Sequence, residues 1–201
     1  MDTKYRWFMV VGALILALLA FNFLNFHVSS SRNHSHFSVG TARSGEALPA
    51  DMTVPFRLAY QVRGADRLVE PLADALQTEL SGLPTVLEAA PVAERAAAEA
   101  GAPLLVVEVN ADAYFWTPFY ARGTATAVFY FDSEGDVAWQ SGDPLVLETS
   151  PAIKSEGEFT LEDSSWGLIS KPAYAQHLSA ALAQSIADGL HKEVFTLPSG
   201  G

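Results

Sequence analysis

The chain has 201 residues, a formal net charge of -11 and no cysteine. The missing cysteines exclude disulfides and thiol chemistry. The acidic balance argues against a nucleic-acid partner, because negative charge on the protein repels a phosphate backbone. A length of this order accommodates one ordinary domain together with a short additional segment at one end.

The first feature along the chain is an uncharged, largely apolar run from Trp7 to Phe26. A run of this length is sufficient for an α-helix to cross a hydrocarbon core of about 30 Å. It exceeds the apolar region of a signal peptide and ends in bulky residues, which favours a retained anchor over a cleaved signal peptide or a buried core helix. We predict a cytoplasmic tail (1–6) and a transmembrane signal anchor (7–27) in the lipid bilayer. Lys4 and Arg6 precede the run and favour a cytoplasmic N-terminus with the C-terminal domain outside the cytoplasm.

Residues 28–54 are rich in Ser, Gly and Ala and have almost no apolar periodicity. This composition predicts a flexible stalk between anchor and domain. His27, His34 and His36 lie in or beside it. A histidine pair on a flexible tether lacks the fixed geometry that a metal site requires, so no metal is predicted.

A strand and a helix open the soluble domain, which we place at 55–195. Large apolar residues alternate from Phe56 to Val62, which is typical of a strand with one buried face. Leucines then recur at every fourth position within residues 66–81, and Gly82 follows. This spacing predicts an amphipathic helix that ends at the glycine.

The middle of the domain is predicted to be mainly β-structure. Leu104 begins a strand that continues through Trp116, and a second long strand covers 123–131. The smaller predicted elements are a short strand at 85–87, a helix at 91–101, a hairpin loop at 132–136, a strand at 137–140 and an edge strand at 144–149.

The last part of the domain is predicted to contain an acidic irregular loop (150–170) and one long helix (172–194) capped by Ser170. A disordered tail (196–201) follows. The fold class is therefore α+β: an N-terminal transmembrane helix, then a two-layer sandwich with a mixed or antiparallel sheet and helices on one face.

This order of elements, the stretch Phe-Asp-Ser-Glu-Gly-Asp-Val-Ala-Trp (131–139) and the closing amphipathic helix resemble the anticodon-binding-like domains of bacterial envelope proteins. Such domains occur in the curli-secretion channel, in the N-terminal part of the Tol propeller protein and in lipoprotein activators of cell-wall synthases. In those lipoproteins an acylated cysteine takes the place of the anchor. The resemblance covers about residues 55–195 and implies a non-catalytic assembly or docking module.

Two groups of side chains are candidates for function. The first is an aromatic segment at a turn between strands, with Tyr114, Trp116, Phe119 and Tyr120 as the candidate interaction surface and the last three expected to be exposed. The second is a polar strand face made by Glu108, Asn110 and Asp112, opposite an apolar face that points into the core.

No nucleophile elbow, P-loop, dinucleotide fingerprint or zinc-protease motif occurs in the sequence. We therefore predict a non-enzymatic, membrane-anchored interaction module that has an envelope protein as partner and binds no cofactor. Two alternatives remain open. One is an apolar-ligand or lipid-binding domain with an aromatic-lined cavity between sheet and helices, and the other is a hydrolase that uses Glu108 and Asp112.

Overall fold

The computed structural model describes residues 3–21, 25–38, 55–92, 102–133 and 154–195. In chain order the elements are α1 (Thr3–Phe21), β1 (Asn25–Ser38), β2 (Phe56–Gly64), α2 (Asp66–Ser81), β3 (Val86–Pro91), β4 (Leu104–Trp116), β5 (Tyr120–Asp132), β6 (Lys154–Ile169), α3 (Lys171–Gly189) and the short π-helical segment η3 (Leu190–Phe195). This is a mixed α+β fold, as the sequence predicts.

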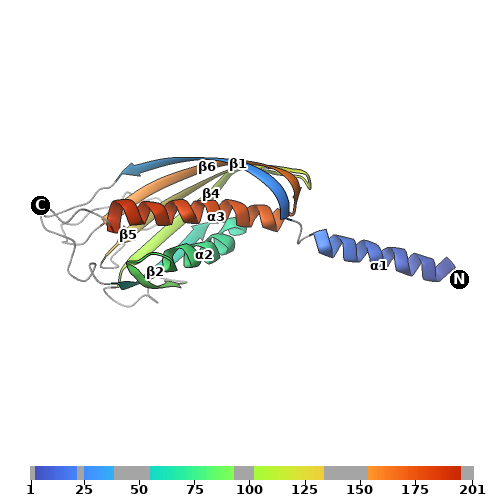
Figure 1. The fold of residues 1–201 in the computed structure, drawn as a ribbon, viewed down its shortest axis with the longest axis horizontal. Helices are drawn as coiled ribbons and strands as arrows, with labels where there is room; N and C mark the ends of the chain where they lie inside the picture. Colours follow the sequence, from blue (N-terminus) through green and yellow to red (C-terminus); the bar gives the residue numbers. More distant parts are fainter. Residues whose placement is uncertain (1–2, 22–24, 39–54, 93–101, 134–153, 196–201) are drawn as a thin grey trace, which may run out of the picture.

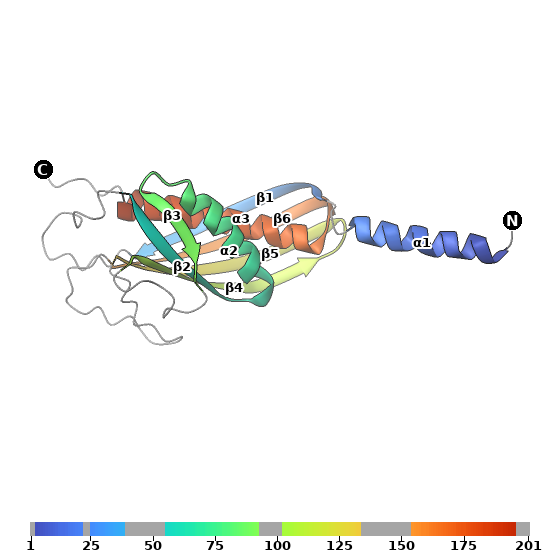
Figure 2. The same ribbon diagram turned by 90° about the horizontal axis from the view of Figure 1, so that it is seen from below.

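Six strands form one curled sheet in the order β1-β6-β5-β4-β2-β3. The pairs β1–β6, β6–β5 and β5–β4 are antiparallel, whereas β2 is parallel to both β4 and β3. Helices α2 and α3 lie side by side on one face, which we call the inner face, while α1 projects from one end of the domain (Figures 1 and 2). Among the described residues the opposite face of the sheet carries no helix, and we call it the outer face.

The core lies between the inner face and the two helices. The apolar stripe predicted for α2 is confirmed, since its four leucines are fully buried. The predicted cap of α3 is also confirmed, because the Ser170 hydroxyl accepts a hydrogen bond from the Ala173 backbone N–H at 3.2 Å. The predicted pair of long strands is present as the antiparallel pair β4 and β5.

The segment predicted as a flexible stalk instead begins with a strand. β1 pairs with β6 over its whole length, from Asn25 opposite Ile169 to Ser38 opposite Glu156. Beyond Phe26 and Val28, the sequence of β1 shows little of the apolar alternation that predicts strands. On its inner side Ser31 and Asn33 make hydrogen bonds instead of apolar contacts. β1 also begins within the predicted span, so the anchor prediction extends too far at its C-terminal end.

The prediction of an irregular loop at 150–170 is also wrong, because this segment too lacks a continuous apolar alternation and yet forms a strand. β6 occupies most of it and pairs with both β1 and β5. Its inner positions include Phe159 and Leu161, but also Gly157 and Asp163. These two residues break the apolar alternation that would have indicated a strand.

No helix in the described ranges combines the length and the apolar character that crossing a bilayer requires. Several other predictions lie outside the described residues: most of the helix at 91–101, the strands at 137–140 and 144–149, most of the hairpin loop at 132–136, and the C-terminal tail at 196–201.

Candidate functional site

The aromatic segment between β4 and β5 is divided between the interior and the surface. Phe119 is exposed as predicted, whereas Trp116 and Tyr120 are half-buried. Trp116 donates a hydrogen bond from its indole Nε1 to the Ile169 carbonyl oxygen at 3.0 Å. Half-buried Tyr114 points to the helices, and its hydroxyl donates to the Lys171 carbonyl oxygen at 3.2 Å. Exposure of the segment is therefore less than predicted.

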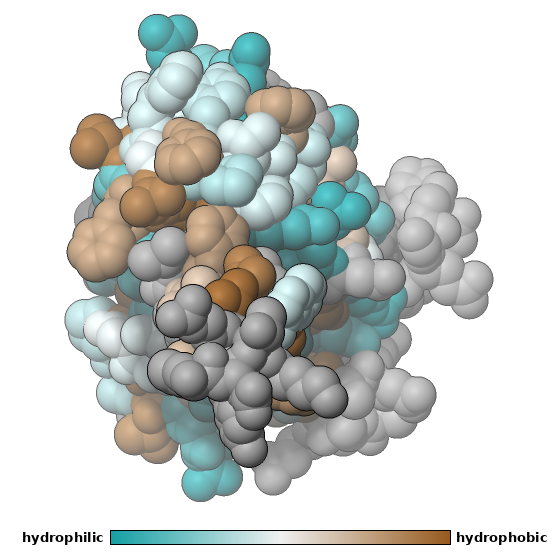
Figure 3. All heavy atoms as spheres, turned by 90° about the vertical axis from the view of Figure 1, so that its right-hand side faces the viewer, coloured by the Kyte–Doolittle hydropathy of each residue, from teal (hydrophilic) through white to brown (hydrophobic). Residues whose placement is uncertain are grey.

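Exposed apolar residues of β1 and β6 lie beside the exposed residues of this segment and form a larger surface with them, which the sequence did not predict. Seven residues form it, and we call them the aromatic rim: Phe26, Val28, Phe115, Phe119, Tyr120, Trp166 and Leu168. Five of them are more than half exposed. In Figure 3, which faces the end of the molecule that carries α1, hydrophobic side chains gather on one side and hydrophilic ones border them.

Strand register explains why these residues meet. Directly opposed residues in an antiparallel pair share a face of the sheet. Trp166 of β6 lies opposite both Val28 of β1 and Tyr120 of β5. The Tyr120 and Trp166 rings are 4.3 Å apart between centroids, and the Phe115 and Tyr120 rings are 6.1 Å apart. The rim is thus one contiguous surface on the outer face.

The predicted polar face of β4 is present, but its carboxylates do not converge. Leu105, Val107 and Val109 are buried on the inner side, as predicted. On the other side Glu108 is half-buried and Asp112 is exposed, at an irregularity in the β4–β5 register. Asp112 accepts a hydrogen bond from the Thr126 hydroxyl at 2.8 Å.

A hydrolase that used both carboxylates would need them close together. Four residues along a strand correspond to about 13 Å, which exceeds the separation of the two carboxyl groups in either class of glycosidase. No arrangement on the described part of this face therefore favours the hydrolase alternative.

A buried carboxylate is the centre of a polar cluster between β1, β6 and α3. The Asp163 side chain, on the inner side of β6, is fully buried. Ser31 of β1 donates to its Oδ1 at 2.6 Å, and Ser165 donates to its Oδ2 at 2.9 Å. His177 of α3 contacts Oδ1 through Nε2 at 3.1 Å. An ionised carboxylate only accepts hydrogen bonds, so His177 carries its proton on Nε2.

His27 completes this cluster from β1. Its ring lies edge-on to the His177 ring, with 5.1 Å between centroids. In a Ser-His-Asp triad the serine hydroxyl bonds the histidine. In this cluster the hydroxyls of Ser31 and Ser165 both donate to the Asp163 carboxylate instead, so the cluster is not such a triad. The cluster joins β1, β6 and α3. We infer that it is structural.

The environment shifts two pKa values in this cluster. Burial lowers the pKa of His27 from its ordinary value of 6.5, the charge of His177 lowers it further, and Asp163 opposes the shift. Burial alone would raise the pKa of Asp163. The hydrogen bonds from His177, Ser31 and Ser165 outweigh burial and bring that pKa below its ordinary value of 3.8.

Acidification is therefore expected to destabilise the domain. Because the folded-state pKa of His27 lies below its unfolded value, the unfolded chain binds more protons between the two values. The free energy of unfolding should fall as the pH drops below 6.5 and reach its lower level beneath the folded pKa of His27. Asp163 adds a second loss beneath pH 3.8, with the same sign. Urea unfolding of the full chain in detergent micelles across this range measures the effect.

Two variants of β1 make the pH experiment specific. His27→Gln should flatten the slope below pH 6.5, whereas His34→Gln, at an exposed position of the same strand, should keep it. Equal slopes in the wild type and His27→Gln would contradict the assignment.

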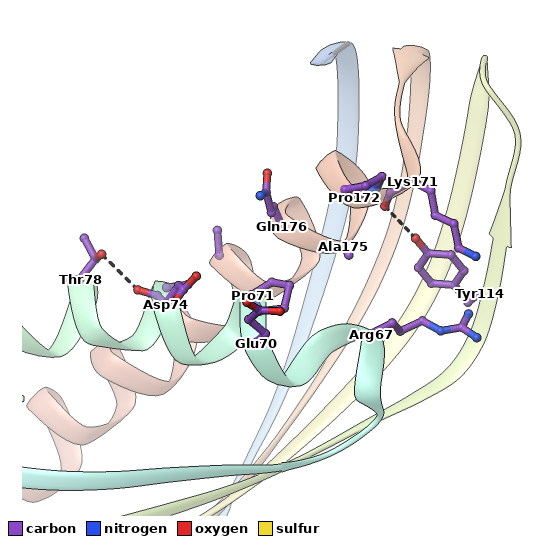
Figure 4. A pocket seen from close by; sticks show the side chains of 12 residues that line it. Arg67, Glu70, Pro71, Asp74, Thr78, Tyr114, Lys171, Pro172, Ala175 and Gln176 are labelled. Atoms are coloured by element: carbon purple, nitrogen blue, oxygen red, sulfur yellow. Dashed lines mark hydrogen bonds between the residues drawn. The ribbon is translucent and has the colours of Figure 1, made fainter. Parts of the chain in front are cut away.

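A groove of about 750 Å³ lies between α2 and α3. Figure 4 shows Tyr114 and Arg67 close together at one end of it, with the guanidinium carbon 5.1 Å from the centre of the Tyr114 ring. The lining includes Pro71 and Ala175, as well as the carboxylates of Glu70 and Asp74. The apolar-ligand alternative predicts an aromatic-lined cavity between sheet and helices. This groove lies between the helices, and Tyr114 is the single aromatic residue in its described lining.

No family model matches the chain, and no curated protein matches it. Among solved structures, the fold is similar to a chain of the PelC dodecamer from Paraburkholderia phytofirmans, at 9% sequence identity and a TM-score of 0.40. The similarity covers 80% of this chain and 98% of that chain. It assigns neither a family nor a function, and the resemblance to anticodon-binding-like envelope domains stays a prediction.

Proposed function

We propose that the chain is a membrane-anchored, extracytoplasmic interaction module without catalytic activity. In this proposal α1 holds the protein in the bilayer, its N-terminus lies on the cytoplasmic side, and the α+β domain binds another envelope component. The single observation that carries the proposal is the surface of α1.

Helix α1 exposes apolar side chains in all directions. Trp7, Phe8 and Leu16 are each about 70% exposed or more, and most of the other large side chains of the helix are over half exposed. The helix projects away from the domain, so the sheet does not cover these side chains (Figures 1 and 2). A helix that is apolar all round requires an apolar environment, either a protein core or a membrane. In the sequence the apolar run also continues beyond α1, through residues 22–24.

Carbonate extraction of membranes tests the anchor. The full chain should remain in the pellet, and Ile15→Arg with Leu19→Arg should move it towards the supernatant, because arginine near the centre of a span costs about 2.5–3.5 kcal/mol on insertion scales. The matched control is Leu87→Arg, at an exposed apolar position of β3, which should leave the protein in the pellet. Release of the unsubstituted chain by carbonate would contradict the proposal.

Protease accessibility of a C-terminal tag tests the orientation. In intact spheroplasts the tag should be digested from outside. Protection of the tag there, with digestion after lysis, would place the domain on the other side of the membrane. A partner in the cytoplasm would then replace the envelope component in the proposal.

A further inference from the structure

We propose that the aromatic rim is a lipid-binding surface, seated at the headgroup level of the bilayer that holds α1. This inference rests on the anchor of the proposed function and names a second contact between the domain and the membrane. The domain would then have a fixed orientation relative to the membrane, because the rim on its outer face would contact the lipid headgroups.

The rim lies beside the end of α1. The ring of Phe21, the last residue of the helix, lies 6.3 Å from the Trp116 ring at the end of β4. β1 begins only four residues later, at Asn25, and brings Phe26 and Val28 into the rim. A bilayer that surrounds α1 therefore meets the domain at this end.

The side chains of the rim are of the types that suit the headgroup layer of a membrane. Tryptophan and tyrosine are enriched where a membrane protein passes through the headgroup layer, because an amphipathic ring suits a boundary between apolar and aqueous phases. Trp166 is 64% exposed, and half-buried Tyr120 packs against its ring. Val28, Phe26 and Phe119 are still more exposed. A contiguous apolar surface of this kind is unfavourable in water.

Charged side chains are distributed unevenly along the outer face. Arg122 lies directly opposite Phe115 and is exposed on the same outer face as the rim. The outer-face carboxylate of β6 nearest to Trp166 is Glu162, about 13 Å further along the strand. Glu158 lies beyond it, again on the outer face. A cation beside the rim and carboxylates of β6 away from it would orient the acidic domain towards anionic headgroups.

The absence of cysteine makes the test direct, since each single-cysteine variant carries one nitroxide label. Three variants of the full chain are reconstituted into equimolar phosphatidylcholine–phosphatidylglycerol vesicles: Leu14→Cys on α1, Val28→Cys in the rim and Glu158→Cys on the outer face. All three positions are exposed. Glu158 lies opposite His36, eight residues or about 27 Å along β1 from Val28, which makes it the matched control. Collisions with oxygen and with a water-soluble nickel chelate report the depth of each label.

The expected result is a deep label on Leu14→Cys, a headgroup-level label on Val28→Cys and a fully aqueous label on Glu158→Cys. An aqueous label on Val28→Cys beside a deep one on Leu14→Cys would overturn the rim inference and leave the anchor intact. An aqueous label on Leu14→Cys would overturn the anchor itself. Spin–spin broadening at Val28→Cys would show a second copy of the chain on the rim and would overturn the assignment to lipid.

Discussion

Replacing Asp163 with alanine is expected to lower the free energy of unfolding by several kcal/mol, because each buried donor left without a partner costs about 1–3 kcal/mol. The side chain is fully buried and accepts hydrogen bonds from Ser31, Ser165 and His177. The substitution leaves these three donors facing a small cavity. It also removes the side-chain contact that joins β1 and α3 through β6.

Unfolding of the full chain in mild detergent, followed by tryptophan fluorescence, measures this loss. The matched control is Glu162→Ala, at the neighbouring exposed position on the opposite side of β6, which should change the free energy by no more than about 0.5 kcal/mol. Asp163→Asn keeps the shape but directs an amide N–H₂ at a donor, so an intermediate loss of about 1–3 kcal/mol is expected. Equal stability of Asp163→Ala and Glu162→Ala would show that the cluster contributes nothing to the fold.

The substitution Gly157→Ala is expected to cost about 1–3 kcal/mol, the usual range when a methyl group is forced into a packed core. Gly157 is buried on the inner side of β6, directly opposite Phe129 of β5. A Cβ at this position would overlap the Phe129 ring. That ring is fully buried and stacks against Phe159 at 5.9 Å, so it cannot turn aside without disturbing its neighbour.

Two further variants separate this overlap from a general effect of replacing glycine. Gly82→Ala is the matched control, because Gly82 has helical backbone angles at an exposed position and a change of less than about 1 kcal/mol is expected there. Phe129→Leu removes the ring and should reduce the loss of unfolding free energy that Gly157→Ala causes. A double-mutant cycle measures this difference. If the cost of Gly157→Ala is the same in both backgrounds, the overlap is not its cause.

Local pattern was sufficient for the elements with continuous apolar faces. The leucine spacing of α2 and the alternation in β4 and β5 predicted elements that are present at nearly the expected residues. The buried face of each of these three elements is made of its own apolar residues, so a window of about ten to twenty residues is enough to predict the element. The cap of α3 was predictable for the same local reason, since Ser170 bonds a backbone group three residues away.

Strands β1 and β6 could not be predicted in this way because their stability depends on one another. Ser31 fits the inner side of a strand because Asp163 lies opposite it and accepts its hydrogen bond. Gly157 fits there because the ring of Phe129, the residue opposite, occupies the space of a side chain. The aromatic rim follows the same rule. Phe26 and Trp166 are distant in sequence, and only the register of β1 with β6 places them on one surface. Their alternation with polar neighbours was the available signal, but it did not show which strands would pair.

The edge position of β1 determines how mechanical force passes from helix α1 to the domain. Figure 1 shows α1 extending away from the end at which β1 begins, roughly along the direction in which the strand runs. A pull on the helix would act along β1 and load its hydrogen bonds to β6 together, in shear, from Asn25 to Ser38. Peeling the strand from one end would instead break those bonds one after another. The arrangement therefore resists tension along α1 better than tension across the sheet.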